Sequence, residues 1–398
     1  MTQFKIQTDD TLYVFNPGLS LLTDENGIPV VEKEAPQRRS RKKGLSMLRI
    51  QLGLRCNYDC EYCKQADQIN PGGTEAVSRD LVDRIHDTYP EIENIYFAGG
   101  EPLLYWDQLS YLIPRLRGLY PEASMGMTSN GSLLNENHRS FFDRYGVYYV
   151  ISHDGPGQYL RSGDPFNSPE RLALIRDWVE NKETRSSIAV NGVLTPLNNR
   201  PTEIVAHIRK QVGEAGHVSF EGVADLNTAT VGKRQLLFDR ESGKALSHDI
   251  LRGYVEGKLA NTCLEQSVHD FVLSMKQQKS SDRISQKCGQ LREDVIAIDL
   301  QGNTLICHSA TSQWNQLGEI GKPGKAKPDQ FAWARRETCA QCLVQQLCRG
   351  GCLLNPYGSE AQQTTCKNDF YYHMGIFSAA FFEVTRRFIT KIEKIGGA

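Results

Sequence analysis

The chain has 398 residues, a formal net charge of −1 and eleven cysteines. This length allows more than one domain and a sizeable core, and the balanced charge excludes a strong overall attraction to nucleic acid or to an anionic membrane. No apolar run is long enough to span a bilayer, and the first ten residues lack the apolar segment of a secretory signal. We therefore expect a cytoplasmic protein whose cysteines serve metal or redox chemistry, and not a secreted, disulfide-bonded one.

Residues 1–46 predict a small β-rich appendage followed by a basic linker. Short apolar runs at Thr11–Phe15 and Ile28–Val31 lie on either side of an Asp-Glu-Asn-Gly turn. The basic run at Gln37–Lys43 is interpreted as a solvated linker, and an electrostatic dock for an acidic peptide is the alternative.

From Met47 to about Leu226, strand-like and helix-like segments alternate, which predicts a parallel sheet with helices on its outside. The number of units falls short of a closed eight-fold barrel. The expected fold class is therefore α/β, with a partial (β/α)6 TIM-like barrel over residues 47–227. Predicted strands cover 48–54, 94–98, 124–129, 147–152, 187–194 and 217–223, and predicted helices cover 79–89, 106–119, 136–145, 169–182 and 204–215.

The loop after the first predicted strand contains Cys56, Cys60 and Cys63 at C-x3-C-x2-C spacing. Three thiolates on one short loop suit a cubane iron–sulfur cluster that keeps one iron without a protein ligand. An open iron would allow the cluster to bind a small molecule and deliver an electron to it. The loop also lies where parallel sheets gather their chemistry, after the carboxyl end of a strand.

The second predicted strand ends at Gly99-Gly100-Glu101. Glycines at a strand end let the backbone approach a ligand closely, because no Cβ stands in the way. Glu101 and the strand-end carbonyls could accept hydrogen bonds from an ammonium group. Alone, such a segment is usually a tight turn before a helix. Beside the cysteine loop it is a strong signal of a ligand-binding site.

Three further polar residues end or line the following strands. Asn130 and Ser152 end the third and fourth strands, and Asn191 lies on the fifth. We consider two explanations for them, a role in lining a site and ordinary turn or strand-end polarity.

The last part of the chain has a different character. Residues 228–285 predict a helical connector, residues 286–368 hold short hairpins and most of the cysteines, and Phe370–Ile395 predicts one long C-terminal helix. A zinc ribbon is one explanation for the cysteine-rich part. Its seven thiols exceed one zinc site and fall one short of two closed tetrathiolate sites. These cysteines are Cys288, Cys307, Cys339, Cys342, Cys348, Cys352 and Cys366.

The cysteine loop, Tyr62 before its last cysteine, and Ala98-Gly-Gly-Glu-Pro102 resemble the motifs of the radical SAM superfamily. The resemblance implies that Cys56, Cys60 and Cys63 hold a [4Fe–4S] cluster whose open iron is chelated by S-adenosylmethionine (SAM). A donor such as a flavodoxin or ferredoxin would reduce the cluster. The reduced cluster would break a C–S bond of SAM, and the 5′-deoxyadenosyl radical would take a hydrogen atom from the substrate.

The segment Ser152-His-Asp-Gly-Pro156 is similar to the Ser-x-Asp-Gly-Pro segment of peptide-modifying members, with His153 in place of an apolar residue. In that family the serine lies near the SAM ribose, and a downstream arginine, here Arg161, faces the cofactor. The SAM-binding residues that the resemblance and the strand ends predict are Tyr62, Gly99, Gly100, Glu101, Asn130, Ser152, Arg161 and Asn191.

The C-terminal cysteines resemble the SPASM domain, which carries two auxiliary [4Fe–4S] clusters and would bring the total to three. The resemblance assigns one cluster to Cys339, Cys342, Cys348 and Cys366. It assigns the other to Cys288, Cys307 and Cys352, with an open iron.

Two residues near the second set carry open assignments. Cys263 is a candidate fourth ligand, although we interpret it as a buried small hydrophobe on a helix. His308 follows Cys307, where sulfatase-maturing relatives have a catalytic aspartate, and is a candidate base. A surface histidine on a hairpin is the alternative.

The resemblance implies a radical SAM/SPASM maturase that abstracts a hydrogen from a ribosomally synthesised precursor peptide and leaves a C–C or thioether crosslink or another oxidative change. Residues 1–46 are too few for a winged-helix leader-binding domain, so the appendage, the barrel rim or a separate protein would recognise the leader. One alternative is a maturase of a folded or nascent protein, of the sulfatase or quinohemoprotein type. A remote alternative is a non-enzymatic metal-binding or redox-sensing protein.

Overall fold

The computed structural model describes residues 2–35, 44–63, 65, 76–181, 185–214, 216–221, 236, 238–310, 315–322, 324–353, 355 and 357–396. The basic run predicted at residues 37–43 lies outside these residues. Among the described helices, none combines the length and the apolar character that crossing a membrane requires.

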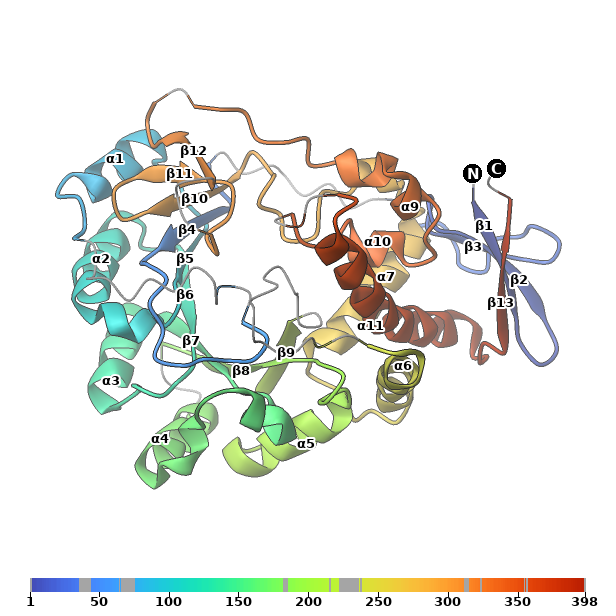
Figure 1. The fold of residues 1–398 in the computed structure, drawn as a ribbon, viewed down its shortest axis with the longest axis horizontal. Coiled ribbons are helices and arrows are strands. Elements are labelled where there is room, and N and C mark those ends of the chain that lie inside the picture. The colour runs from blue at the N-terminus through green and yellow to red at the C-terminus, as the bar shows by residue number, and fades with distance from the viewer. Residues whose placement is uncertain are drawn as a thin grey trace.

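The larger of two sheets is a curved, nine-stranded sheet in the order β12-β11-β10-β4-β5-β6-β7-β8-β9 (Figure 1). From β4 to β9, strands that follow one another along the chain pair in parallel. The predicted partial (β/α)6 barrel is therefore confirmed. Its strands are β4 (Met47–Gln51), β5 (Asn94–Ala98), β6 (Ser124–Ser129), β7 (Val147–Ser152), β8 (Ile188–Val193) and β9 (His217–Glu221).

Five helices lie along the outside of this sheet (Figure 1). Side chains alternate between the two faces of a strand, and in β4 the fully buried Leu48 and Ile50 belong to the core beneath these helices. Arg49 is therefore on the opposite, inner face. The helices are α1 (Leu81–Thr88), α2 (Trp106–Leu119), α3 (Glu136–Tyr145), α4 (Pro169–Glu180) and α5 (Pro201–Val212).

Local signals set the ends of these helices. Asn135 caps α3, since its side chain accepts a hydrogen bond from the His138 N–H, and Gly146 ends α3 in the left-handed conformation with φ 60°. Ser168 caps α4 in the same way, and Pro169 occupies the first helical position, where its missing N–H costs nothing.

A hairpin from the predicted cysteine-rich segment extends the barrel sheet. Strand β10 (Val295–Asp299) pairs in parallel with β4, and β11 (Asn303–Leu305) and β12 (Gln316–Glu319) continue the sheet beyond it. The hairpin ends beside the first barrel strand, because Gln51 donates hydrogen bonds to the carbonyls of His308 and Ala310 at 2.6 and 2.7 Å. Residues predicted to form a separate C-terminal domain thus contact the inside of the barrel.

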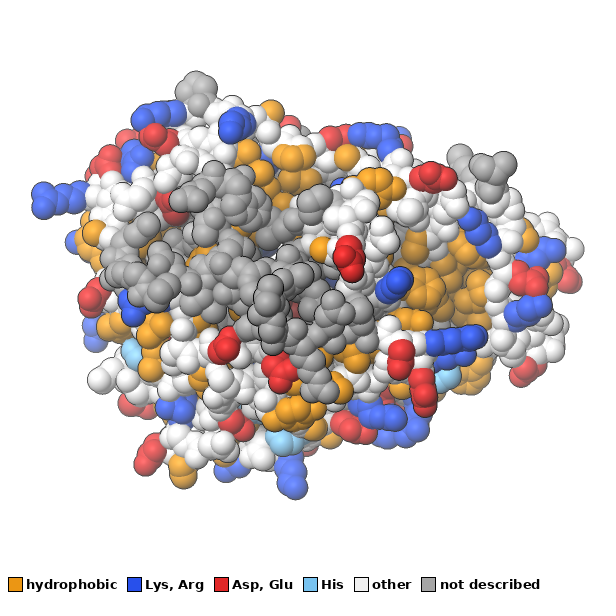
Figure 2. All heavy atoms as spheres, in the orientation of Figure 1, with side chains coloured by type: hydrophobic (Ala, Val, Ile, Leu, Met, Phe, Trp, Pro, Cys, Tyr) orange, Lys and Arg blue, Asp and Glu red, His pale blue; other side chains and the backbone are white. Residues whose placement is uncertain are grey.

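The predicted N-terminal β appendage forms the second sheet. Strands β1 (Gln3–Gln7), β2 (Leu12–Asn16) and β3 (Leu21–Asp24) join β13 (Lys391–Ile395) in the order β13-β1-β2-β3, so the two termini lie close together (Figure 1). Phe15 packs against Phe271 and Phe377, with ring centroids 6.3 and 5.1 Å away. Figure 2 shows hydrophobic side chains gathered beside this sheet.

The remaining helices join the two sheets. The segment predicted as a helical connector contains α6 (Arg240–Val255) and α7 (Cys263–Gln277), and α6 packs along the C-terminal helix α11 (Glu360–Thr385). The short helices α9 (Glu337–Ala340) and α10 (Gln345–Cys348) carry cysteines. Single 3-10 turns are η2 (Pro102–Tyr105), η3 (Gly155–Leu160), η4 (Pro165–Asn167), η5 (Ser281–Arg283) and η6 (Ala332–Arg335).

The predicted helix over 370–395 is wrong at its C-terminal end. Helix α11 stops at Thr385, Arg386 adopts the left-handed conformation, and β13 then pairs antiparallel with β1. Short strands depend on their partner more than on their own sequence. Because the partner strand lies at the other end of the chain, the local pattern gave no sign of it.

Candidate functional site

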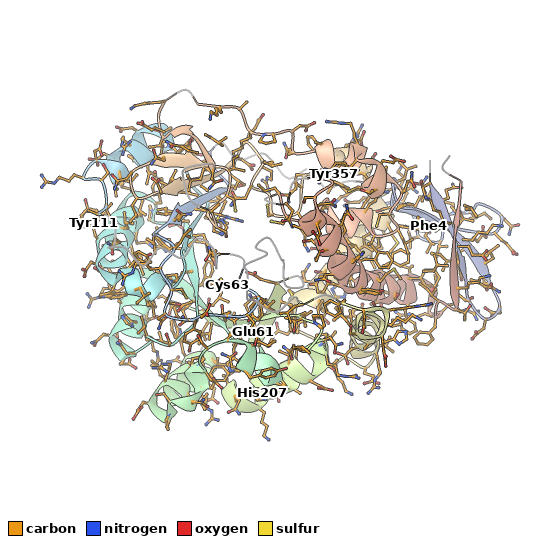
Figure 3. The ribbon with its side chains drawn as sticks, in the orientation of Figure 1. Phe4, Glu61, Cys63, Tyr111, His207 and Tyr357 are labelled. Atoms are coloured by element: carbon orange, nitrogen blue, oxygen red, sulfur yellow. The ribbon has the colours of Figure 1, made fainter. Side chains whose placement is uncertain are left out.

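The cysteine loop leaves β4 and brings three thiols together on the inner side of the sheet. Cys56, Cys60 and Cys63 lie close enough for their charges to interact, which contributes to a raised pKa at Cys56 and Cys60. Burial is the main cause, and the pKa of Cys60 rises to about 12. Metal binding must therefore displace protons from these thiols. Figure 3 shows Cys63 and Glu61 on this loop, whereas His207 and Tyr111 lie on the outer helices.

The Gly-Gly segment after β5 holds the cysteine loop by its backbone. The Gly100 N–H donates to the Gly53 carbonyl at 3.0 Å, and the Glu101 N–H donates to the Arg55 carbonyl at 2.8 Å. A Cβ on Gly100 would lie 2.3 Å from the Arg55 oxygen, closer than any side chain permits. Gly99 and Gly100 are thus required for the loop to lie against the strand end.

Glu101 is completely buried and joins the ends of β5 and β6. Its carboxylate accepts hydrogen bonds from Leu103 N–H at 2.9 Å, Ser129 Oγ at 2.7 Å and Asn130 N–H at 2.7 Å. Burial raises its pKa, and the three hydrogen bonds oppose this rise. The carboxylate faces donors of the protein, so any ammonium that approaches this segment would meet the backbone carbonyls.

Asn130, predicted from the end of the third barrel strand, lies beside the thiols. Its Nδ2 is 3.9 Å from Cys56 Sγ and donates to Asn57 Oδ1 at 2.8 Å. The side chain therefore contacts two consecutive residues at the start of the cysteine motif.

Sequence reasoning missed Asp154, which connects Tyr62 and Arg161. Arg161 donates to both carboxylate oxygens of the fully buried Asp154 at 3.1 Å, the Val193 N–H donates at 2.8 Å, and the Tyr62 hydroxyl donates as well. Burial lowers the pKa of Arg161. Asp154, Tyr62 and Cys60 raise it by a larger amount, so the pKa of Arg161 lies above its usual value. The sequence signal that could have predicted this pair is an aspartate at a strand end, seven residues before an arginine.

The Asp154 network ties the cysteine loop to the ends of two barrel strands. Asp154 follows β7, Val193 ends β8, and Tyr62 comes from the loop itself. The Arg161 guanidinium lies 5.4 Å from the centre of the Tyr62 ring. Arg161 was predicted to face the cofactor, and the structure shows its charge paired with Asp154.

Ser152 and Asn191 are opposite each other on β7 and β8. The Asn191 Oδ1 accepts a hydrogen bond from Ser219 Oγ at 2.9 Å. Both residues lie on the strand ends that carry the Asp154 network, and their roles toward a cofactor stay predictions.

Four of the C-terminal cysteines line one cavity of about 340 Å³, and they are the four assigned to one auxiliary cluster. The pKa of Cys366 is raised to about 11, mainly by burial and further by Cys339 and Asp369. The four are Cys339, Cys342, Cys348 and Cys366.

Cys348 has two buried polar neighbours that the sequence gave no reason to select. Ligand atoms of Cys348, Asp369 and His373 lie within 4.8 Å of one another. Lys287 Nζ is 3.3 Å from His373 Nε2, and burial lowers the pKa of this histidine well below its usual value. Asp369 and His373 lie one turn apart on α11, which explains how they face one cysteine.

Cys288 and Cys307, assigned to the other auxiliary cluster, also lie close enough for the charge of one to raise the pKa of the other. His308 follows on the same hairpin, and its Nδ1 lies 2.9 Å from Gln290 Nε2 and 3.4 Å from an Arg49 nitrogen. The grouping of Cys352 with this pair stays a prediction.

Cys263 opens α7 and contacts β9. Its sulfur accepts a hydrogen bond from the Phe220 N–H at 3.0 Å, and burial raises the pKa of the thiol. This contact agrees with a packed structural cysteine.

A partial barrel that presents three thiols at the carboxyl edge of its sheet defines a class of iron–sulfur protein. Residues 50–186 match the Radical SAM superfamily, and this part of the chain is a radical SAM domain. Such a domain implies a [4Fe–4S] cluster and SAM.

Solved structures have the same overall fold. The structure of anSMEcpe with bound AdoMet and Cp18Cys peptide has a TM-score of 0.62 at 18% identity, and covers 86% of this chain and 98% of that one. SuiB of Streptococcus suis bound to precursor peptide SuiA has a TM-score of 0.54 at 16% identity, and covers 80% of this chain and 74% of that one. These likenesses show that the chain shares the overall fold of both structures.

A shorter stretch is similar to a curated enzyme. GTP 3′,8-cyclase of Staphylococcus aureus (strain JH9) is 31% identical over 103 residues, which is 24% of this chain. The match spans 30% of the cyclase, so this chain is similar to less than a third of that enzyme.

Proposed function

We propose that this protein is a radical SAM/SPASM maturase that oxidatively modifies a ribosomally synthesised precursor peptide. The observation that carries the proposal is the convergence of Cys56, Cys60 and Cys63 on a loop anchored to the sheet edge by Gly100 and by the Asp154 network. When bound there, a [4Fe–4S] cluster and SAM supply a 5′-deoxyadenosyl radical that abstracts a hydrogen atom.

The protein's part in this reaction is to bind the cofactors and the substrate, to orient them and to enclose them. The three thiols hold the cluster, and Asn130 donates toward Cys56. Backbone carbonyls at Gly99 and Gly100 accept from the SAM ammonium. The SAM-contacting set that we propose is Tyr62, Gly99, Gly100, Glu101, Asn130, Ser152, Arg161 and Asn191.

Two auxiliary [4Fe–4S] clusters complete the cofactor set. The cavity of about 340 Å³ supports a cluster held by its four lining cysteines. Cys288, Cys307 and Cys352 hold the other, which leaves one iron without a cysteine ligand. When bound, such clusters would supply an electron acceptor or an anchoring site for the substrate.

The partners that we propose are a precursor peptide and a one-electron donor such as a flavodoxin or ferredoxin. Structures of two neighbours include peptides, described as the Cp18Cys peptide and precursor peptide SuiA, which supports a peptide substrate. We propose a separate leader-recognition protein as a further partner, with the four-stranded sheet and the barrel rim as the alternative surfaces for leader recognition.

Anaerobic co-expression with the adjacent small open reading frame, followed by mass spectrometry, tests the proposal. A loss of two hydrogens per event indicates a crosslink or desaturation. If iron-loaded protein under reducing, anoxic conditions never forms 5′-deoxyadenosine from SAM, the proposal is wrong. If it cleaves SAM but leaves the peptide unchanged, that peptide is not the substrate.

Maturation of a folded or nascent protein is the second candidate, supported by the higher TM-score of anSMEcpe and its 98% coverage. The place after Cys307 is occupied by His308, whereas sulfatase-maturing enzymes have an aspartate there. Incubation with a sulfatase-derived cysteine or serine peptide distinguishes the two, because formylglycine formation would favour the second candidate.

A further inference from the structure

Four barrel strands align a row of residues on the inner face of the sheet. Arg49 pairs with Tyr96 across β4 and β5, Tyr96 with Gly126 across β5 and β6, and Gly126 with Tyr148 across β6 and β7. We call Arg49, Tyr96, Gly126 and Tyr148 the Arg49 row. Its three side chains are half-buried, so they are accessible from the interior of the barrel.

The glycine of the row makes room for a phenol. A Cβ on Gly126 would lie 2.2 Å from the Tyr148 ring, so this ring lies directly over the glycine and extends toward Tyr96. Burial raises the pKa of Tyr148 to about 12, Tyr96 adds to the rise, and Arg49 opposes it. Tyr148 is therefore a neutral hydrogen-bond donor near the Arg49 charge, whereas the Tyr96 hydroxyl donates to Thr128 Oγ1 at 2.6 Å.

Among the residues that the structure describes, Arg49 is a cation without an acidic partner. Throughout the described part of the chain, no carboxylate forms an ion pair with it, whereas the inner-edge Arg161 is paired with Asp154. A guanidinium on a half-buried surface among hydroxyl groups favours a planar anion that accepts two parallel hydrogen bonds.

His308 does not supply this anion. A guanidinium only donates, so His308 Nδ1 accepts from Arg49 at 3.4 Å and also from the Gln290 amide at 2.9 Å. The edge-to-face rings of His308 and Tyr96, 6.3 Å apart, close one side of the row.

The row lies between two predicted cluster sites. Arg49 precedes Cys56 by seven residues on the strand that leads into the SAM-cluster loop, and its neighbour His308 directly follows Cys307. A group bound at Arg49 would thus be held on the same inner face as the reaction.

We propose that the Arg49 row binds a carboxylate of the peptide substrate, with the guanidinium as the ionic partner and the Tyr148 phenol as a donor. This inference rests on the proposed function and specifies its substrate class: a peptide with an acidic side chain, or its own C-terminus, near the modified residue. A carboxylate suits the row better than a phosphate does, because the row offers one cation and a neutral donor, whereas phosphate sites gather more charge.

Weak-affinity chromatography on immobilised, cluster-loaded protein with SAM present tests the inference. The probes are acetyl-Gly-Asp-Gly-amide, acetyl-Gly-Asn-Gly-amide and acetyl-Gly-Gly-Gly with a free C-terminus. We expect the Asp peptide to be retained about threefold longer than the Asn peptide, as for a partly buried ion pair. In Arg49→Gln the ratio should fall to about one, and Arg49→Lys should keep part of it. Stronger retention of the third peptide would assign the site to a chain terminus.

Arg115→Gln is the matched control, because Arg115 stacks on Tyr111 on the outside of α2, 3.8 Å from the ring centre. For Arg115→Gln, the ratio of the retention of the Asp peptide to that of the Asn peptide should equal the ratio measured for the unmodified protein. Thermal midpoint and iron content show whether each variant is folded, and Tyr148→Phe, which keeps the ring over Gly126, should reduce the ratio if Arg49→Gln fails to fold.

Three results would overturn the inference: equal retention of the Asp and Asn peptides, a ratio that survives Arg49→Gln, or elution of the Asp peptide by inorganic phosphate but not by acetate. The formation of 5′-deoxyadenosine separates this failure from that of the proposed function. Protein that cleaves SAM without carboxylate selectivity refutes only the inference, whereas protein that never cleaves SAM refutes the proposed function.

Discussion

At the scale of single residues, the site depends on how closely the backbone can approach itself. Gly100 lies against the Arg55 carbonyl, and this contact sets the height of the cysteine loop above the sheet. The sequence predicted a glycine for ligand approach. In the structure, the space beside Gly100 is occupied by the backbone of the protein's own cysteine loop.

Gly100→Ala should therefore disturb the SAM-cluster loop. The added Cβ would meet a backbone atom at 2.3 Å, and such overpacking costs about 1–3 kcal/mol. We expect a lower free energy of unfolding and a loss of about four irons per chain, measured by denaturant titration and iron analysis.

Gly118→Ala is the matched control, because no atom lies within 4 Å of a Cβ at this position in α2. Alanine in a helix is more favourable than glycine by about 0.5–1 kcal/mol. The stability should rise by that amount with the iron content unchanged. A Gly100→Ala protein with full iron content would contradict our account of the loop.

Asp154→Asn should be strongly destabilising. It leaves the guanidinium of Arg161, whose side chain is 7% exposed, without its ionic partner, and breaking a buried pair costs about 3–5 kcal/mol. Asp177→Asn breaks the ion pair with Arg139 at a site where the aspartate is 62% exposed, and should cost less than about 1 kcal/mol. Denaturant midpoints of the two variants test this difference, and similar midpoints would contradict it.

At the scale of elements, the small N-terminal sheet is part of the C-terminal half of the fold. Phe15 on β2 fills the space between α7 and α11, and β13 pairs with β1. A disturbance in the first strands should therefore reach the helix that carries Cys366.

Phe15→Ala should lower the free energy of unfolding by about 3–5 kcal/mol, because the ring is 1% exposed. Ile28→Ala removes a side chain that is 61% exposed in the same region, and should change it by less than about 0.5 kcal/mol. Hydrogen exchange would show whether α11 loses protection together with β2. Unchanged protection in α11 would mean that the sheet unfolds alone.

At the scale of the whole molecule, three groups of cysteines lie on one chain, and their roles can be separated. Three [4Fe–4S] clusters predict about 12 irons per chain. Cys56→Ala and Cys342→Ala should each remove about four. The first should abolish SAM cleavage, whereas the second should retain much of it and block product formation.

Cys263→Ala provides the comparison within the same chain. Its sulfur contacts the Phe220 backbone on β9, so the variant should keep about 12 irons. A loss of iron in this variant would instead make Cys263 the missing fourth ligand of the cluster at Cys288 and Cys307.

Much of the architecture could be read from the sequence because its signals are local. The strands at 94–98, 124–129 and 147–152 agree with β5, β6 and β7 to the residue, since alternating burial and helical spacing depend on neighbours a few positions away. The cysteine spacing in the first loop identified the radical SAM domain for the same reason. The cysteine spacing is a local signal, because the three cysteines lie within one short loop.

The tertiary structure decided what depends on distant partners. Pairing of β13 with β1 and of β10 with β4, the hydrogen bond of Tyr62 to Asp154, and the alignment of Arg49 with Tyr96 and Tyr148 all join segments far apart in the chain. The periodicity of the local sequence gives no sign of such contacts. The reason is that the free energy of a strand pair or of a buried charge comes from the partner and not from the sequence around either member.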